Sequence, residues 1–267
     1  MIFVKQYGEK RTGTNLVRAM LEYYFDNVQV LMHVPGDKHA LPVDYNLLKE
    51  CLVTADNPVG VIKEFSEKNA GDTTNFSDTG QLDFLEQLAP LLGEAIIADR
   101  LCFCIHVKNP FAWIVSISKW EGWRASDIAN SKRFIPYVRD AVCRYNDKYR
   151  SWLNLKEAFP ERTTIIRYEA LLESPVDIIK QIVSLTGAGL NDKPEKYFDG
   201  IVLPCHWDNQ PTAMHHAGFD KSFYDEKRYL NLLSASAIRT ISEHIDGELM
   251  KSYGYNIEEW IVEKIAL

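Results

Sequence analysis

Residues 2–15, with the sequence IFVKQYGEKRTGTN, decide the fold class of this chain. The first six of these residues are mostly β-branched, aromatic or otherwise apolar, a composition typical of a strand. After Gly13, apolar side chains recur at helical spacing, at Leu16, Met20, Leu21 and Tyr24. The stretch therefore predicts a strand, a tight loop and a helix in direct succession.

The same alternation continues along the chain. Further strands are predicted at 28–33, 59–63, 101–107 and 163–167, and helices at 82–92, after Pro110, and at 134–158, 170–185 and 235–253. Alternating strands and helices imply one α/β domain over residues 1–267, a three-layer, P-loop-like fold whose parallel central sheet is flanked by helices. Ligands bind at the carboxyl ends of such strands, so the loops after Tyr7, Lys63, Val107 and Arg167 are expected to face one cleft.

Composition narrows the class of protein. The 267 residues are 46% hydrophobic and 25% charged, with a formal net charge of -7, which is typical of a globular protein and argues against a nucleic-acid partner. No apolar stretch has membrane-spanning length, and the N-terminus reads as a strand rather than a targeting segment. The odd, low count of five cysteines indicates a reducing compartment, so a cytoplasmic location is expected. The sequence does not predict an oligomeric state.

The loop at residues 8–15 has the chemistry that a phosphate or sulfate needs. Glycine lets the backbone approach a ligand closely, and the N-terminus of the following helix offers free N–H groups and a positive dipole end. Arg11 adds a fixed charge, and Thr12 and Thr14 add hydroxyl groups. A plain strand–turn–helix junction capped by threonine is the alternative interpretation.

The spacing of this loop resembles the nucleotide-triphosphate motif G-x-x-x-x-G-K-[ST] but differs where that motif binds phosphate and magnesium. Thr14 occupies the lysine position and Asn15 the position of the magnesium ligand. The strand at 101–107 is followed by Lys108, where a magnesium site would need an aspartate. The loop is therefore expected to bind an anion without a metal, and a magnesium-dependent P-loop small-molecule kinase is the alternative.

A second cation lies at the end of the strand at 101–107. Lys108 follows this strand, and Ser116 comes two turns into the next helix. Together they could hold a second phosphate, although a solvated strand end and an ordinary helical serine would look the same.

The two segments together resemble the donor-binding motifs of the P-loop-like sulfotransferases. Residues 11–15 resemble that family's Lys-Ser-Gly-Thr-Thr loop, and residues 107–116 its Val-Arg-Asn-Pro motif with a later serine. Residues 167–172 and 248–255 resemble its Tyr-Glu-Asp-Leu step and its closing Gly-Tyr helix. The order is the family's, over most of the chain, but Arg11 replaces a lysine and Lys108 an arginine.

The resemblance implies transfer of a sulfuryl group from 3′-phosphoadenosine 5′-phosphosulfate to a hydroxyl or amine, leaving adenosine 3′,5′-bisphosphate. Arg11 would neutralise the leaving phosphate, and Lys108 with Ser116 would hold the 3′-phosphate. Tyr168 would lie against the adenine. The 5′-phosphate would be held by Thr12, Gly13, Thr14 and Asn15.

The resemblance also suggests a base. Residues 61–65 are similar to the family's Ile-Lys-Thr-His segment, with Phe65 where the histidine stands. Lys63 would touch the sulfuryl group, and Glu64 is the preferred base because carbohydrate-type members use a glutamate in this region. Glu67 and His106 are alternatives. The missing histidine leaves open a non-catalytic nucleotide-binding module.

The acceptor is expected to be a small molecule or carbohydrate. Its pocket would be shaped by loops at 34–57, 66–80, 120–132 and 201–225. In relatives a late basic loop closes over the 3′-phosphate, which here suggests the cluster of Lys221, Lys227 and Arg228.

Overall fold

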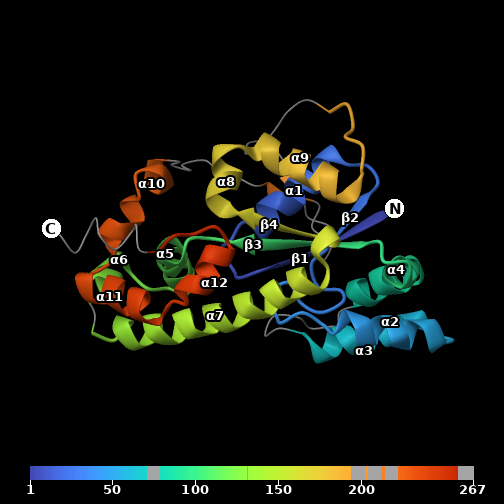
Figure 1. The fold of residues 1–267 in the computed structure, drawn as a ribbon, viewed down its shortest axis with the longest axis horizontal. Helices are drawn as coiled ribbons and strands as arrows, with labels where there is room; N and C mark the ends of the chain where they lie inside the picture. Colours follow the sequence, from blue (N-terminus) through green and yellow to red (C-terminus); the bar gives the residue numbers. More distant parts are fainter. Residues whose placement is uncertain (71–78, 131, 194–201, 204–211, 214–221, 258–267) are drawn as a thin grey trace.

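A computed structural model describes residues 1–70, 79–130, 132–193, 202–203, 212–213 and 222–257 of the chain. Its centre is a four-stranded parallel sheet with strand order β2-β1-β3-β4 (Figure 1). The strands are β1 (Ile2–Gly8), β2 (Val28–Leu31), β3 (Leu101–Val107) and β4 (Thr163–Arg167). The predicted α/β class with a parallel central sheet is confirmed.

Helices cover both faces of the sheet, as the near-continuous burial of the strands requires. One face packs against α1 (Thr14–Tyr24), α8 (Tyr168–Glu173) and α9 (Pro175–Thr186). The other packs against α2 (Tyr45–Thr54), α4 (Thr79–Ile97), α5 (Pro110–Trp120) and α7 (Phe134–Ala158), with α3 (Pro58–Lys68) packed on α2 and α4. No helix within the described ranges has both the length and the hydropathy needed to cross a bilayer.

Successive side chains of each strand enter different cores. Phe3 and Phe103 point toward α2 and α7, whereas Val4 and Cys104 point toward α1 and α9. The remaining elements are α6 (Ala125–Asn130), η1 (Pro160–Arg162), β5 (Val202–Leu203), β6 (Thr212–Ala213), α10 (Ser222–Asp225), η2 (Arg228–Leu232), α11 (Ala235–His244) and α12 (Gly247–Ser252).

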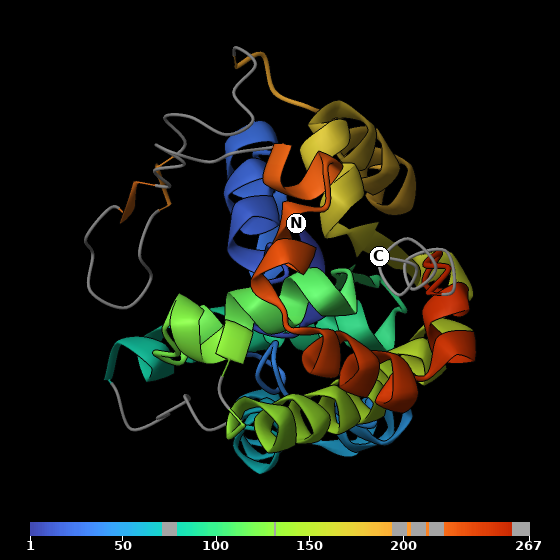
Figure 2. The same ribbon diagram turned by 90° about the vertical axis from the view of Figure 1, so that its left-hand side faces the viewer.

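The carboxyl ends of the strands meet at one edge of the sheet. Gly8 is paired with His106, and Val107 with Arg167, so the loops after β1, β3 and β4 begin side by side. Helix α7 supports this edge, because the hydroxyl of Tyr145 donates to the Lys108 carbonyl at 2.6 Å. Figure 2 looks onto this edge and shows the orange segment of α10 and η2 crossing it.

The strand predicted at 59–63 is wrong, because these residues belong to helix α3. Asn57 caps this helix by accepting a hydrogen bond from the Gly60 amide, and Pro58 occupies its first turn. The partner of β1 on this side is β2, so the loop that reaches the carboxyl edge follows Leu31 rather than Lys63.

Two long predicted helices are divided. The segment 170–185 is interrupted at Ser174, because the following Pro175 cannot continue the α8 hydrogen bonds and instead starts α9. The segment 235–253 is interrupted before Asp246, whose side chain caps α12 by accepting from the Leu249 amide at 3.0 Å.

Candidate functional site

The loop after β1 is a tight turn held by its own backbone. The amide of Thr12 donates to the Glu9 carbonyl at 3.3 Å, and the Thr12 hydroxyl donates to the same carbonyl at 2.6 Å. Arg11 has φ 71 and Gly13 has φ 90, both in the left-handed region. A Cβ on Gly13 would lie 2.9 Å from the Tyr168 ring, so glycine is required there for space as well as for conformation.

This turn directs the N-terminus of α1 at open space. Gly13 is the N-cap residue and has no side chain to cap the first-turn amides. These amides and the helix dipole therefore form a positive site at Thr14 and Asn15.

We call the space in front of α1 the anion cavity; its volume is about 210 Å³. It is lined by Arg11, Gly13, Thr14, Asn15, Leu16, Lys108, Ser116, Tyr168 and Tyr224. The structure thus brings together every residue expected to hold the donor except Thr12, whose buried hydroxyl is used inside the loop. Tyr224 is an addition from α10 that the sequence did not indicate.

Lys108 is the most deeply placed cation of the anion cavity, with 1% of its surface exposed. Its Nζ donates to the Tyr224 hydroxyl at 3.0 Å and lies 4.2 Å and 4.7 Å from the ring centroids of Tyr168 and Tyr224. Burial lowers the pKa of Lys108 to about 7, against the attraction of Glu169 and with a smaller contribution from Arg11. An anion beside Lys108 would restore its charge.

Arg11 is the second cation that lines the anion cavity. Its Nε donates a long hydrogen bond of 3.5 Å to the hydroxyl of Ser116, which brings both predicted phosphate contacts to one place. Glu169 is turned away, since its carboxylate accepts from the Asn109 amide and the Tyr255 hydroxyl.

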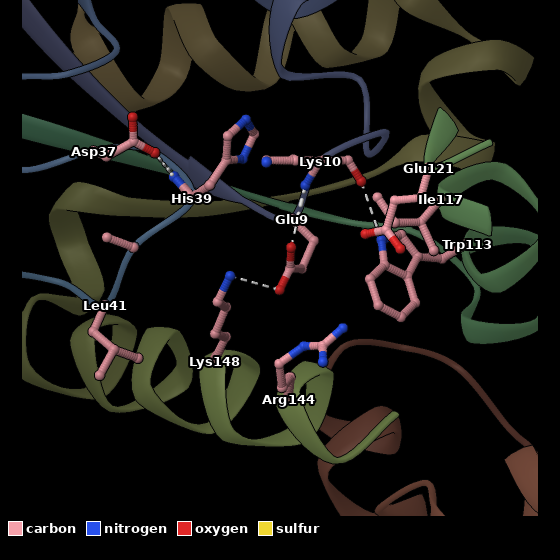
Figure 3. Close-up of a pocket in the computed structure, with 11 residues that line it drawn as sticks. Glu9, Lys10, Asp37, His39, Leu41, Trp113, Ile117, Glu121, Arg144 and Lys148 are labelled. Carbon is pink, nitrogen blue, oxygen red and sulfur yellow. Dashed lines mark hydrogen bonds and ion pairs between the residues drawn. The ribbon is translucent and has the colours of Figure 1, made fainter. Parts of the chain in front are cut away.

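Two further cavities continue from the first. The middle cavity, about 250 Å³, shares Arg11, Thr14 and Asn15 with the anion cavity. Its other lining residues are Lys10, His33, Lys38, His39 and Trp120. The outer cavity, about 510 Å³ and drawn in Figure 3, shares Lys10 and His39 with the middle one. The three cavities therefore form a series along the carboxyl edge of the sheet.

The loop after β2 carries a histidine–aspartate pair, of which His33 lines the middle cavity and Asp37 the outer one. His33 Nδ1 lies 2.7 Å from Asp37 Oδ2, while Asp37 Oδ1 accepts from the His39 amide at 2.7 Å. Burial raises the pKa of Asp37, but its contacts with His33 and His39 outweigh burial and hold that pKa well below its usual value. Burial lowers the pKa of His33, although the hydrogen bond to Asp37 opposes this.

Beneath this loop lies Lys5 of β1, which is fully buried. Its Nζ donates to the carbonyls of Met32 at 3.1 Å and Gly36 at 2.6 Å. These bonds fix both ends of the segment that carries the histidine–aspartate pair.

Two neighbours complete the middle cavity. His39 Nδ1 lies 2.6 Å from the Gly8 carbonyl, so this nitrogen carries the proton and Nε2 the lone pair. Burial, followed by the charge of Lys38, lowers the pKa of His39 to about 3. Lys38 donates to Asn15 Oδ1 at 2.6 Å, and burial lowers its pKa to about 7.

The structure does not bring Lys63 and Glu64 to any of these cavities. They lie on helix α3, where Lys68 pairs with Glu64 at 2.6 Å and Lys63 with Glu67 at 3.9 Å. Their predicted roles depended on a strand at 59–63, and a solvent-facing helix removes that basis. His106 is fully buried on β3 and lines none of the three cavities.

The late basic cluster is placed only in part. Lys221 lies outside the described residues, and Arg228 donates to the Ser222 hydroxyl. Neither Lys227 nor Arg228 lines the described cavities. Of the predicted acceptor loops, 34–57 and 120–132 contribute to the outer or middle cavity, and 201–225 contributes Tyr224 to the anion cavity.

Sequence reasoning missed the group formed by His33, Asp37, Lys38 and His39. The sequence feature that could have indicated this group is the occurrence of four ionisable residues close together, directly after a short strand. The pairing of β2 with β1, which brings these residues beside the loop after β1, has no signal in the local sequence.

Comparisons with known proteins found similarity to solved structures. No family model matches the chain, and no curated protein matches it. The chain is similar to the sulfotransferase domain of the Synechococcus PCC 7002 olefin synthase, at 16% identity and a TM-score of 0.47 over 95% of this chain and 94% of that one. It is also similar to the sulfotransferase domain from the curacin biosynthetic pathway, at 16% identity and a TM-score of 0.41 over 91% and 96%.

Proposed function

We propose that this chain transfers a sulfuryl group from 3′-phosphoadenosine 5′-phosphosulfate to a hydroxyl group of a small molecule, carbohydrates included. The observation that carries the proposal is the anion cavity, where Arg11 and the N-terminus of α1 meet Lys108 from a separate segment. Two cations at different walls suit a ligand with two separate anionic groups, as this donor has.

The donor's two anionic ends are assigned to different residues. Lys108 and Ser116 bind the 3′-phosphate, and Tyr168 provides an aromatic face for the adenine. The phosphosulfate lies against the first-turn amides of α1 and the side chains of Arg11 and Asn15. Arg11 then stabilises the charge that develops on the leaving phosphate, in an arrangement formed before the reaction begins.

The charges of these walls favour such a donor over a magnesium triphosphate. Among the described residues, no carboxylate lines the anion or the middle cavity. A magnesium-dependent kinase would need at least one carboxylate there. The carboxylate of Glu169, whose charge acts on Lys108, accepts hydrogen bonds from Asn109 and Tyr255.

His33 is the proposed base, in place of the glutamates on α3. Asp37 accepts the Nδ1 proton, which makes Nε2 the proton acceptor and orients the ring. The acceptor oxygen forms a bond to sulfur as the bond between sulfur and the bridging oxygen breaks. The electron pair stays on the 5′-phosphate of the leaving bisphosphate, and the acceptor proton goes to His33.

A thermal-shift measurement tests the donor assignment. We expect adenosine 3′,5′-bisphosphate to raise the melting temperature without metal, and ATP with magnesium to do little. The opposite preference would refute the proposal. If the bisphosphate binds but no hydroxyl compound receives labelled sulfate from the donor, the chain is a nucleotide-binding module.

A further inference from the structure

The outer cavity is large enough for a whole small molecule. Its walls come from α5, α7 and the loops after β1 and β2, and its apolar part is formed by Trp113, Ile117 and Leu41 (Figure 3). Its inner end is His39, which also lines the middle cavity. An acceptor can therefore present one end at the middle cavity and lay its body along this wall.

Several charged groups of the outer cavity already have contacts within the chain. Lys148 pairs with Glu9 at 2.8 Å. Asp37 is fully buried and accepts from the His39 amide. The Nζ of Lys10 lies 4.6 Å from the ring centroid of Trp120. Glu9 and Lys148 therefore balance each other and Asp37 has its own donors, whereas the contact of Lys10 is with an aromatic ring.

Glu121 and Arg144 are the two remaining charges. Burial, followed by the Glu121 carboxylate, raises the pKa of Tyr137, and the charge of Arg144 opposes this, so both charges lie near that hydroxyl. Arg144 makes no hydrogen bond or ion pair with any residue of the described part of the chain. Figure 3 shows its side chain extending from α7 into the outer cavity.

A guanidinium group at the edge of an apolar wall matches a carboxylate, because its N–H groups meet both oxygens at once. We infer that the acceptor is a hydroxy acid: an apolar body with a hydroxyl at one end and a carboxylate at the other, bound by Arg144. This inference rests on the proposed function for the hydroxyl, but the carboxylate site depends only on the outer cavity.

Matched acid and amide pairs test it. The probes are para-hydroxyphenylacetate, para-hydroxyphenylpropanoate and a series of ω-hydroxy fatty acids, each beside its carboxamide. Binding is measured by calorimetry with adenosine 3′,5′-bisphosphate present, and transfer by labelled sulfate. We expect the acids to exceed their amides by about tenfold or more in affinity and in kcat/KM.

Variants of two arginines on α7 distinguish carboxylate binding by Arg144 from a general effect of positive charge on this helix. Arg144→Gln should remove the preference for acids, and Arg144→Lys should restore part of it. Arg139→Gln is the control, because Arg139 is on the same helix but pairs with Asp140 at the surface. It should leave the preference unchanged.

The outcomes distinguish the two proposals. Acids that bind through Arg144 without receiving sulfate would support the carboxylate site and count against sulfuryl transfer. Equal transfer to acids and amides, unaltered in Arg144→Gln, would overturn the carboxylate site and leave the proposed function standing. Failure of every acid to bind would also overturn the site.

Discussion

Arg11 combines an unfavourable backbone with a central position in the proposed chemistry. Its φ of 71 lies in the left-handed region, which costs a side-chain-bearing residue about 1 kcal/mol or more. Its side chain is also the one that reaches Ser116 and lines both the anion and the middle cavity. Backbone strain at such a position is consistent with a functional requirement for the side chain.

Arg11→Gly separates these two effects. Glycine accepts the left-handed backbone, so we expect the free energy of unfolding to stay the same or rise by about 1 kcal/mol. Loss of the guanidinium should lower kcat by a factor of about 10² to 10³. Urea unfolding measures the free energy of unfolding, and transfer of labelled sulfate measures kcat. Arg11→Lys is the comparison variant, because it keeps the positive charge. Normal turnover in Arg11→Gly would contradict the assigned role.

Lys108 should link donor binding to protons. Burial holds its pKa near 7 in the free protein, and a bound phosphate would raise that pKa. Between pH 7 and 9 the protein must then take up a proton on binding, so affinity for adenosine 3′,5′-bisphosphate should fall as pH rises. Calorimetry in buffers of different ionisation enthalpy counts the protons taken up. Lys108→Met should reduce that number by about one; an unchanged number would refute the linkage.

At the scale of the element, all four strands of the central sheet were predicted from the sequence, whereas the fifth predicted strand, at 59–63, belongs to a helix. The predictable strands are apolar runs closed by glycine, proline or charge, and buried on both faces. Residues 59–63 are an apolar run of the same length, which periodicity alone cannot assign to strand or helix. The Asn57 cap and Pro58 decide for helix α3.

The donor half of the site was predictable because each residue lies next to its own strand in the sequence. The histidine–aspartate half depends on β2 lying beside β1, which is a tertiary fact. No local sequence pattern around His33 predicts that β2 pairs with β1.

Helix α3 therefore offers a direct test of the corrected site. The double change Lys63→Ala and Glu64→Ala removes two exposed i,i+4 ion pairs, so the free energy of unfolding should change by less than about 0.5 kcal/mol. Sulfate transfer should stay within about twofold of the unaltered protein. A large loss of kcat with unchanged stability would restore the role expected from the sequence.

In the loop after β2, a change at Asp37 should affect both His33 and His39. Asp37→Asn keeps the shape of the side chain but removes the charge that orients the His33 ring. It also weakens the acceptor of the hydrogen bond from the His39 amide. We expect kcat to fall by a factor of about 10² to 10⁴, since the same change in other histidine–carboxylate pairs disturbs the imidazole tautomer. The acidic limb of the pH–rate profile, where protonation of His33 removes the base, should be weakened or lost, whereas donor affinity should be nearly unchanged. Equal losses in donor affinity and kcat would indicate general damage.

At the scale of the whole molecule, the three cavities follow the carboxyl edge of the sheet between its two helical layers. Positive charge is concentrated below this edge in three buried lysines, Lys5, Lys38 and Lys108. Burial is the main cause that lowers each of their pKa values to about 7. The free protein thus holds these cations at a cost in stability that an anionic ligand relieves at Lys108.

This cost predicts how stability depends on pH. In the unfolded chain a lysine titrates near 10.4, so between about pH 7 and 9.5 the unfolded state binds more protons than the native state. The free energy of unfolding should therefore rise with pH over this window. Above about pH 10 it should fall, because burial raises the pKa of Tyr7 and Tyr45 and the native state resists their ionisation.

Urea unfolding at intervals from pH 7 to 9.5 measures the effect. The midpoint urea concentration should increase with pH, while the dependence of the unfolding free energy on urea concentration stays constant. Saturating adenosine 3′,5′-bisphosphate should flatten the increase, because Lys108 is charged in the complex and no longer takes part. Lys108→Met should flatten it to a similar extent without ligand. Lys68→Met changes an exposed lysine of α3 and is the control. It should leave the increase of the midpoint with pH unchanged. A midpoint that falls between pH 7 and 9.5 would mean that these lysines are charged in the native protein, and that the anion cavity is not short of negative charge.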